Sequence, residues 1–282
     1  MYSLSVENPY GEKMELTHNA NYTISNIDGI DPPDADINTT RNAGEDGSIY
    51  NSAYINPRTI TITLAINYPA ESNRINLYRY FKSKFPVTLY YENETRKVYI
   101  KGYVQTMQIA FFGKKQTAQI VINCPKPLFN GQDEDVQEFA GINPVFEFPF
   151  ALEEAGEPFS EIELDQEKVV VNNGDIETGV LIRIHAIGAI VNPKIYNTGT
   201  NEHIFINYTL RAGDDITINT MRGEKSITLR RDGAETGIIG AFVIGSAWIQ
   251  LAPGDNVFAV AADSGLENMV VTMTIIDQFE GV

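Results

Sequence analysis

The side chain best suited to chemistry in this chain of 282 residues is its single cysteine, Cys124, within the stretch INCPKPLF. A thiol becomes a nucleophile when a histidine or a helix N-terminus lowers its pKa and solvent can reach it. Here an apolar, strand-like segment ends at the cysteine, and Pro125 and Pro127 stop the ladder rather than start a helix. The chain's three histidines lie far away in sequence. We therefore predict a buried structural thiol and no catalytic residue.

A second candidate is the acidic segment DGIDPPDAD, residues 28–36. Clustered carboxylates can bind calcium, but the spacing of an EF-hand loop with its closing glutamate is absent. Two consecutive prolines make the segment stiff and extended. We predict a solvated segment, or one that packs on a neighbouring chain, and no metal site. The candidate contact residues are Asp31, Pro32, Pro33, Asp34 and Asp36.

Aromatic side chains in the second half offer a surface on which a sugar ring could stack, with Trp248, Tyr208 and Tyr196 as the candidates. Trp248, however, stands in the most apolar run of the chain, where tryptophan is usually part of the core. The pattern favours the core position, and glycan stacking is kept as the alternative.

Sequence motifs of known enzyme classes are missing, including G-x-S-x-G, Walker A, the dinucleotide-binding glycine pattern and H-E-x-x-H. A carboxylate pair for glycoside hydrolysis has many acids to draw on, but nothing singles out one pair. We predict that the protein is not an enzyme and that it takes no cofactor and no metal.

Charge divides the chain into two parts. Its net charge of −16 argues against a protein that grips nucleic acid by its phosphates. Residues 1–130 hold 13 Lys and Arg against 12 Asp and Glu, whereas residues 131–282 hold 8 against 25. Such a step is typical of a domain boundary. We predict a domain over 1–130, an acidic linker over 131–144 and a second domain over 145–282.

Membrane association is not expected. The opening MYSLSVENPYGEKMEL alternates and carries early acids, unlike a secretory signal. The most apolar run, IIGAFVIGSAWIQLA at 238–252, is too short and too interrupted for a spanning helix.

The elements that must position these residues are mostly strands. In the first half, alternating segments around short turns predict hairpins, and ESNRINLYRYFKSKFP predicts one helix over about 71–84. The polar stretch 31–57 between strands is expected to be a long loop, which in a compact domain is usually functional or disordered. The second half shows short strands between turn signals, a pattern typical of an antiparallel β-sandwich or jelly roll. The predicted fold is therefore mainly β, with a strand-rich α+β domain before a sandwich.

The ordered set of motifs goes further. The segments ISNIDGIDPPDADINT, RTITITLAI, NLYRYF, GYVQTMQIAFF and QIVINCPKPLF, within about residues 3–130, resemble the N-terminal domain of the distal tail protein (Dit) family of long-tailed bacteriophages or prophages. In the second half, VVVNNGDIETGVLIRI, NPKIYN and SAWIQLAPGDNVF resemble that family's galectin-like C-terminal module.

The resemblance implies a structural role at the virion tail tip, for a protein made in the bacterial host cytoplasm. In this family the N-terminal domains form a hexameric ring that joins the tail tube protein to a tail-associated lysin or spike. DNA passes through the ring without sequence-specific binding. The C-terminal domains project outwards and hold a receptor-binding protein or touch the host surface. The alternative function is binding of a cell-surface glycan by the C-terminal sandwich, and a cell-wall hydrolase is a third, weaker hypothesis.

Overall fold

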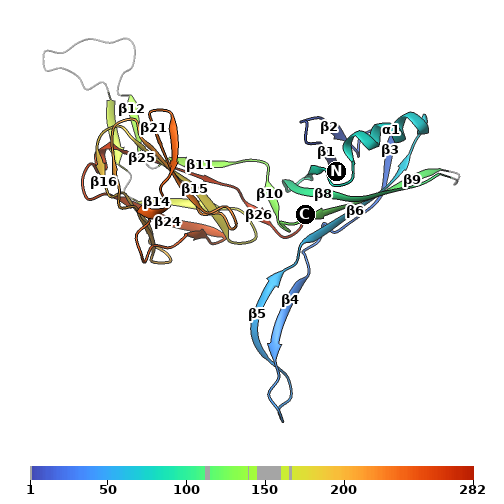
Figure 1. Ribbon diagram of the computed structural model, residues 1–282, viewed down its shortest axis with the longest axis horizontal. Helices are drawn as coiled ribbons and strands as arrows, with labels where there is room; N and C mark the ends of the chain where they lie inside the picture. Colours follow the sequence, from blue (N-terminus) through green and yellow to red (C-terminus); the bar gives the residue numbers. More distant parts are fainter. Residues whose placement is uncertain (1, 112–114, 139, 145–159, 165–166) are drawn as a thin grey trace. The chain divides into compact units, whose positions relative to one another are not determined.

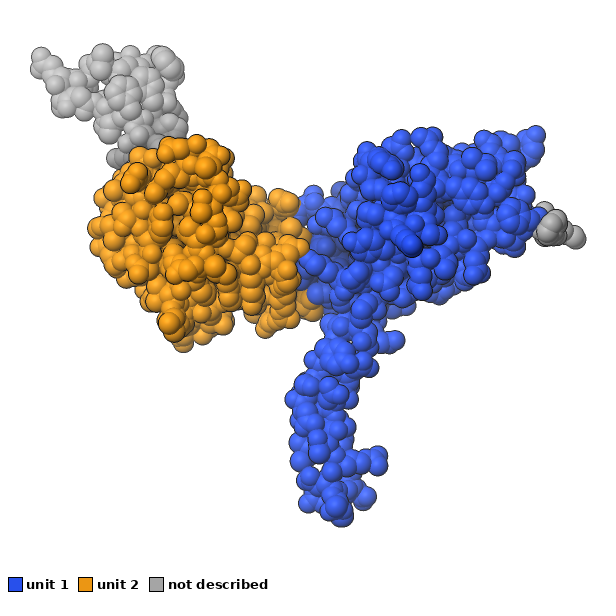
Figure 2. Space-filling view, in the orientation of Figure 1, with its two compact units in different colours: residues 1–133, 278–282 blue, residues 134–277 orange. Residues whose placement is uncertain are grey.

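The computed structural model describes residues 2–111, 115–138, 140–144, 160–164 and 167–282 (Figure 1). The chain divides into two compact units (Figure 2). Unit 1 comprises Met1–Asp133 and Gln278–Val282, and unit 2 comprises Glu134–Asp277. Unit 2 is therefore an insertion in the chain of unit 1. The described residues are mainly strand, with one α-helix, which confirms the predicted fold class.

Unit 1 is built on an antiparallel sheet in the order β2-β1-β7-β8-β9-β6-β3, with β10 and β26 attached beside β8. Its strands are β1 (Ser3–Glu7), β2 (Lys13–Glu15), β3 (Tyr22–Asp28), β6 (Arg58–Ile66), β7 (Pro86–Glu92), β8 (Lys97–Ala110), β9 (Gln116–Cys124), β10 (Phe129–Gly131) and β26 (Gln278–Phe279). The predicted hairpins β1–β2, β7–β8 and β8–β9 are confirmed. Alternate positions of these strands are apolar and buried in one core.

The helix α1 spans Ala70–Tyr80, so it ends earlier than the predicted 71–84. Leu77 on its inner face is fully buried, and Phe81 directly after it is buried as well. The main chain then turns toward the sheet, because Lys84 donates its N–H to the carbonyl of Val104 on β8 and adopts a positive φ of 69°. That bond to β8 replaces the next turn of helix. Lys84, the last residue of the predicted helix, lies outside α1 and is exposed.

The stretch 31–57, predicted to be a loop, contains an antiparallel hairpin of β4 (Ala35–Thr40) and β5 (Ile49–Ile55). We call this hairpin the arm. It extends from the end of the sheet where β3 and β6 lie, as the pale blue ribbon in Figure 1 shows. The prediction was wrong because every residue of the two strands is exposed, so that they lack the alternation that marks a half-buried strand.

Unit 2 is the predicted antiparallel sandwich. One sheet has the order β11-β25-β15-β20-β21-β22, with β23 paired to β15, and the other has the order β14-β24-β17-β18. The strands of the first sheet are β11 (Asp135–Glu138), β25 (Met269–Ile275), β15 (Thr178–Ala186), β20 (Asp215–Asn219), β21 (Ser226–Arg231), β22 (Ala234–Gly237) and β23 (Gln250–Leu251). Those of the second are β14 (Glu167–Asn172), β24 (Gly254–Ala261), β17 (Lys194–Asn197) and β18 (Glu202–Phe205). Buried residues from both sheets form one core.

The boundaries differ from the predicted ones at two places. The segment 131–144, expected to be a linker, contains β11 paired to β25, and β12 (Ala140–Pro144) paired to β13 (Ser160–Leu164). Strand pairing uses backbone groups, so an acidic composition does not prevent it. The predicted start of the second domain, at 145, lies outside the described residues. At the other end, residues 278–282 belong to unit 1, where β26 pairs with β10.

Unit 2 also contains a small two-stranded ladder, in which β16 (Ile190–Val191) pairs with β19 (Thr209–Leu210). The short 3₁₀ turns η1 (Ile239–Ala241) and η2 (Leu266–Asn268) lie in its loops. Across the described ranges, no helix is long and apolar enough to cross a bilayer.

Candidate assembly surface

The arm exposes apolar side chains that nothing in unit 1 covers. All residues of β4 and β5 are exposed, including Ile37 at 64%, Tyr50 at 63% and Ile55 at 37%. A two-stranded hairpin that packs on nothing is marginally stable in water. Contiguous exposed apolar groups mark interaction surfaces. The arm therefore has the properties of an element that is completed by a partner.

The register of the arm places Ile37, Tyr50 and Ile55 on one face, whereas Ile49 and Tyr54, each 55% exposed, lie on the other. Ile37 lies opposite Ala53, and Ala35 lies opposite Ile55. The register shifts after Asn38, so that Thr39 faces Tyr50 and Asn51 has no partner position. Without this bulge Tyr50 would point to the other face, because side chains alternate along a strand. The apolar arm face then consists of Ala35, Ile37, Tyr50, Ala53 and Ile55.

The root of the arm is fixed by Arg58, a buried residue with 4% exposure. Its guanidinium donates to the carbonyl oxygens of Gly29 and Asp31 at 2.8 Å each, and to that of Pro127 at 2.7 Å. A further bond goes to the carbonyl of Glu280. Gly29 and Asp31 lead into β4, so this side chain holds the segment from which the arm leaves the sheet.

Two further contacts join the end of the chain to the same place. Val282 donates its N–H to the carbonyl of Ile30 at 3.2 Å. Arg96 bonds the carbonyl of Gly281 and lies 4.6 Å from the ring centre of Phe279. The segment Gln278–Val282 thus closes over the arm root, and we call it the C-terminal strap.

The predicted contact residues lie at this root and at the start of the arm. Asp31, Pro32 and Pro33 form the irregular chain before β4, Asp34 directly precedes it, and Asp36 lies opposite Tyr54 on the second face of the arm. All are exposed except Pro33, which is half-buried. In the part of the chain that the structure describes, no group of three or more His, Cys, Asp or Glu residues is placed to hold a metal ion.

Cys124 ends β9 and is fully buried in the core of unit 1. Burial raises the pKa of its thiol to about 12, despite the nearby charge of Arg58. A buried neutral thiol is a poor nucleophile. The geometry agrees with a structural residue, as predicted.

The three candidate sugar-stacking residues are separate in unit 2. Trp248 stacks on Phe242 with ring centres 4.7 Å apart, and both pack against the core. Tyr208 lies beneath the guanidinium of Arg231. Tyr196 contacts Phe205 edge-on at 5.4 Å. Among the described residues, no ring contact joins any two of the three candidates, so they form no common platform.

A charged cluster in unit 2 was not foreseen from the sequence. The buried carboxylate of Asp215 accepts bonds from Arg183 at 2.9 Å, Arg230 at 2.6 Å and His185 at 2.8 Å. His185 on β15 and Arg230 on β21 pair with Asp215 on β20 in the strand register, and Arg183 lies two positions before His185 on β15. Burial alone would raise the pKa of Asp215, but the three hydrogen bonds outweigh it and lower the pKa to about 2. The cluster is an ion-pair network that joins three strands.

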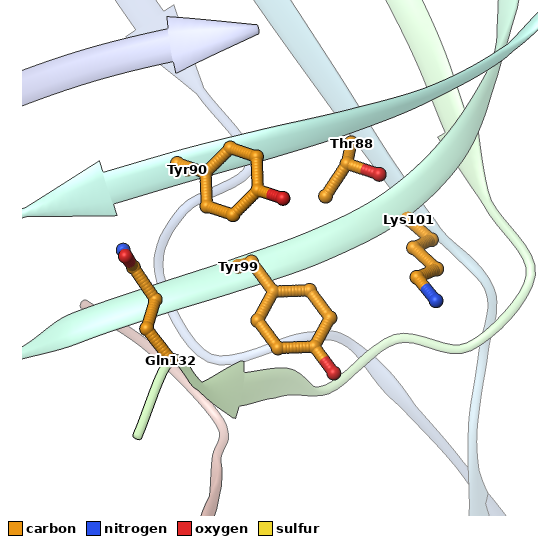
Figure 3. A pocket seen from close by; sticks show the side chains of 5 residues that line it. All are labelled: Thr88, Tyr90, Tyr99, Lys101 and Gln132. Carbon is orange, nitrogen blue, oxygen red and sulfur yellow. The ribbon is translucent and has the colours of Figure 1, made fainter. Parts of the chain in front are cut away.

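Figure 3 shows a shallow cleft of about 270 Å³ in unit 1, lined by Thr88, Tyr90, Tyr99, Lys101 and Gln132. Its polar groups are engaged with each other and with neighbours. The rings of Tyr90 and Tyr99 lie 6.1 Å apart, and the Tyr90 hydroxyl donates to Glu7 at 2.8 Å. Burial, together with Glu7, raises the pKa of Tyr90 to about 12. The arrangement is a packed polar surface without a poised acid or base.

Comparisons with known proteins address both units. Residues 10–124 match the family model described as phage tail protein RIFT-related domain. Residues 173–274 match the model described as siphovirus-type tail component, C-terminal domain. The two matches follow the two units in order and together span most of the chain. No curated protein matches the sequence.

The fold is similar to three solved phage structures. The first is the SPP1 Dit protein, described as a paradigm of the hub adsorption apparatus in phages that infect Gram-positive bacteria, with 13% identity, a TM-score of 0.66 and 99% of each chain covered. The others are the phage P2 baseplate in its activated conformation with Ca, at 10% identity and a TM-score of 0.53, and the same baseplate with Sr, at 11% and 0.51. Both baseplate matches cover all of each chain.

The two family matches stand in the order that the sequence motifs predicted. The structural match to the SPP1 Dit protein covers almost all of both chains. This chain belongs to the distal tail protein (Dit) family of siphovirus-type phages and is a structural component of the phage tail tip.

Proposed function

We propose that six copies of this protein form a hexameric ring that is the hub of the tail tip. The ring joins the tail tube protein above to a tail-associated lysin or spike below and leaves a channel for DNA. It acts without catalysis and without a cofactor. The observation that carries the proposal is the arm, an element of unit 1 that is left unpacked within its own chain.

A projecting arm suits a ring because a ring needs two different contact surfaces on each copy. In a head-to-tail arrangement, one patch of each subunit binds a second patch of the next, and the series closes when the rotation divides a full circle. The apolar arm face, Ile37, Tyr50 and Ile55 above all, is a patch of this kind. The arm root, clamped by Arg58, holds it in a constant direction.

The distribution of charge supports the same arrangement. The near-neutral residues 1–130 tolerate close packing of six copies, whereas the strongly acidic residues 131–282 repel one another. Unit 2 is accordingly placed at the periphery, where it holds a receptor-binding protein. A ring built mainly through unit 2 would contradict this.

Light scattering tests the proposal. The purified protein is expected to form a particle of about 190 kDa, six times the 31.4 kDa chain. Replacing Ile37, Tyr50 and Ile55 by Ser should return it to the mass of a single chain with its fold intact. The matched control replaces Asn38 and Ser52, a polar pair on the second face of the arm, by Ala and should leave the particle unchanged. A particle that survives loss of the apolar arm face would refute the role of the arm.

A further inference from the structure

The search for the surface that receives the arm leads to α1. We propose that the apolar arm face of one copy binds the exposed face of α1 on the next copy. This inference rests on the proposed ring and names the second patch that the ring requires. We define the basic helix face as Arg74, Ile75, Tyr78, Arg79 and Lys82.

Arg74 and Ile75 lie one turn before Tyr78 and Arg79 on the same side of the helix, and Lys82 follows just past its end, whereas Asn73 and Leu77 point to the core of unit 1. Ile75 is 50% exposed and Tyr78 is 36% exposed. An isoleucine, a tyrosine and an arginine at the centre of an exposed patch are residue types that dominate the energy of protein interfaces.

Arg74 holds the patch in a constant shape. Its guanidinium donates to the hydroxyl of Tyr78 at 2.8 Å and lies 5.3 Å from the centre of that ring. The ring of Phe111, 47% exposed, lies 5.2 Å from the same guanidinium. The apolar groups of α1 and of the end of β8 therefore form one continuous surface with limited side-chain freedom, which lowers the entropic cost of binding.

Charge identifies the arm as the occupant of this surface. Residues 70–85 carry Arg74, Arg79, Lys82 and Lys84 against a single acid, Glu71, for a net charge of +3. Glu71 pairs with Arg74, and Glu12 pairs with Arg79. Lys82 and Lys84 are exposed just past the end of the helix, where cations are favoured.

The arm has the opposite charge. Residues 34–56 carry Asp34, Asp36, Glu45 and Asp46 against Arg41 alone, for a net charge of −3. Two arms therefore repel each other, as do two basic helix faces, whereas an arm and a helix face attract. Complementary charge of this kind selects the correct pairing and steers the encounter. It also makes the contact head-to-tail, since each copy offers one patch of each sign.

The rival surface is the tyrosine cleft of Figure 3, which also carries a lysine, Lys101. Its aromatic rings contact each other, and Lys13 lies 4.0 Å above the ring of Tyr90. Because these groups already satisfy one another, less apolar surface is left to bury there. The helix face is therefore favoured.

A two-variant mixture tests the pairing. Variant H carries Arg79→Glu and Lys82→Glu, so its arm and helix face are both acidic. Variant A carries Glu45→Lys and Asp46→Lys, so its arm and helix face are both basic. Each variant alone should associate more weakly than the wild type, by about tenfold or by a larger factor. The equimolar mixture should restore association, because each arm then meets a helix face of opposite sign in an alternating ring. The control, Lys97→Glu with Lys101→Glu, changes charges at and near the tyrosine cleft and should assemble normally.

Sedimentation with one label on each variant measures the outcome. Variants H and A that assemble as well as the wild type, or a mixture that restores nothing while the wild type forms a ring, would overturn the pairing and leave the ring standing. Loss of assembly in the control would move the contact to the tyrosine cleft. A wild-type protein that forms no ring refutes the ring, but a specific complex between H and A would still support the arm-to-helix contact. Absence of that complex would refute both.

Discussion

The guanidinium of Arg58 donates a hydrogen bond to the carbonyl oxygen of Glu280, a residue 222 positions further along the chain. The same group bonds the carbonyls of Gly29 and Asp31, where the chain enters the arm. One buried cation therefore joins the arm root to the C-terminal strap. Because the strap follows the last strand of unit 2, the two ends of the insertion are anchored in unit 1 by neighbouring strands, β10 and β26.

Replacing Arg58 by Met should destabilise unit 1 by about 2–3 kcal/mol, because the charged hydrogen bonds are lost and buried carbonyls remain without a donor. Hydrogen exchange read by mass spectrometry should show faster exchange in residues 24–34 and 278–282, with the core of unit 2 unchanged. Lys97→Met, an exposed lysine paired with Glu92, is the control and should cost little. Unchanged exchange at the arm root in the Arg58 variant would argue against its anchoring role.

Cys124 should resist thiol reagents in the folded protein. Its pKa is raised to about 12, so almost no thiolate is present at neutral pH, and the side chain is fully buried. Because the folded pKa lies above the unfolded one, this thiol contributes stability below about pH 9 that is lost as the pH rises toward 12. Ellman's reagent should label the chain only on unfolding in urea. Rapid labelling of the native protein at pH 7 would be inconsistent with the buried position.

Asp215→Asn should destabilise unit 2, because Arg183, Arg230 and His185 lose a shared charged acceptor. The folded pKa of about 2 lies below the ordinary value of 3.8, so the contribution of the carboxylate is present above pH 4 and is lost as the pH falls toward 2. A shift of this size corresponds to about 2 kcal/mol. Urea unfolding followed by the fluorescence of Trp248 should show the difference at pH 7 and little of it near pH 2.

The control for that experiment is Asp255→Asn, on an exposed position of β24 in the same unit. It should leave the unfolding midpoint almost unchanged at both pH values. An Asp215 variant as stable as the wild type at pH 7 would mean that the network costs as much in desolvation as it contributes.

Trp248→Ala should lower the stability of unit 2 by about 1–3 kcal/mol, because the ring stacks on Phe242 and packs against the sandwich core. Tyr196→Ala, on the outward side of β17, should cost less. Circular dichroism during heating measures both. A glycan-array signal that vanishes in either variant without loss of stability would instead support the sugar-stacking alternative.

Regular patterns made unit 1's sheet and the sandwich predictable, and the deviations have physical causes. The segment RTITITLAI alternates, and β6 buries alternate residues such as Ile60, Ile62 and Leu64 as the pattern requires. The arm could not be predicted in the same way, since an unpacked hairpin has no buried face to leave a pattern. The contact region predicted at Asp31–Asp36 stays a prediction; these residues lie at the arm root and on β4.

Long-range hydrogen bonds could not be predicted from the sequence, for a different reason. In the sequence, Arg58 is the first polar residue of a predicted strand. Nothing in the neighbouring residues indicates that its guanidinium donates to the carbonyl oxygens of Pro127 and Glu280. Likewise Asp215 meets Arg183 and Arg230 only once the register of three strands is known. Periodicity predicts elements, whereas such contacts depend on how distant elements pair.

Gly29 should be irreplaceable at the arm root, and a comparison with Gly44 separates two causes. Both have positive φ, 85° and 90°, so a side chain is strained at either position. A Cβ on Gly29 would lie 2.1 Å from the carbonyl oxygen of Thr59, whereas one on Gly44, near the arm tip, meets nothing within 4 Å. Gly44→Ala should cost about 1 kcal/mol. Gly29→Ala should cost clearly more, because the backbone of β6 has to move, and it should also weaken assembly by redirecting the arm. Equal costs for the two variants, measured by urea unfolding, would show that the close approach to Thr59 is not what fixes the arm.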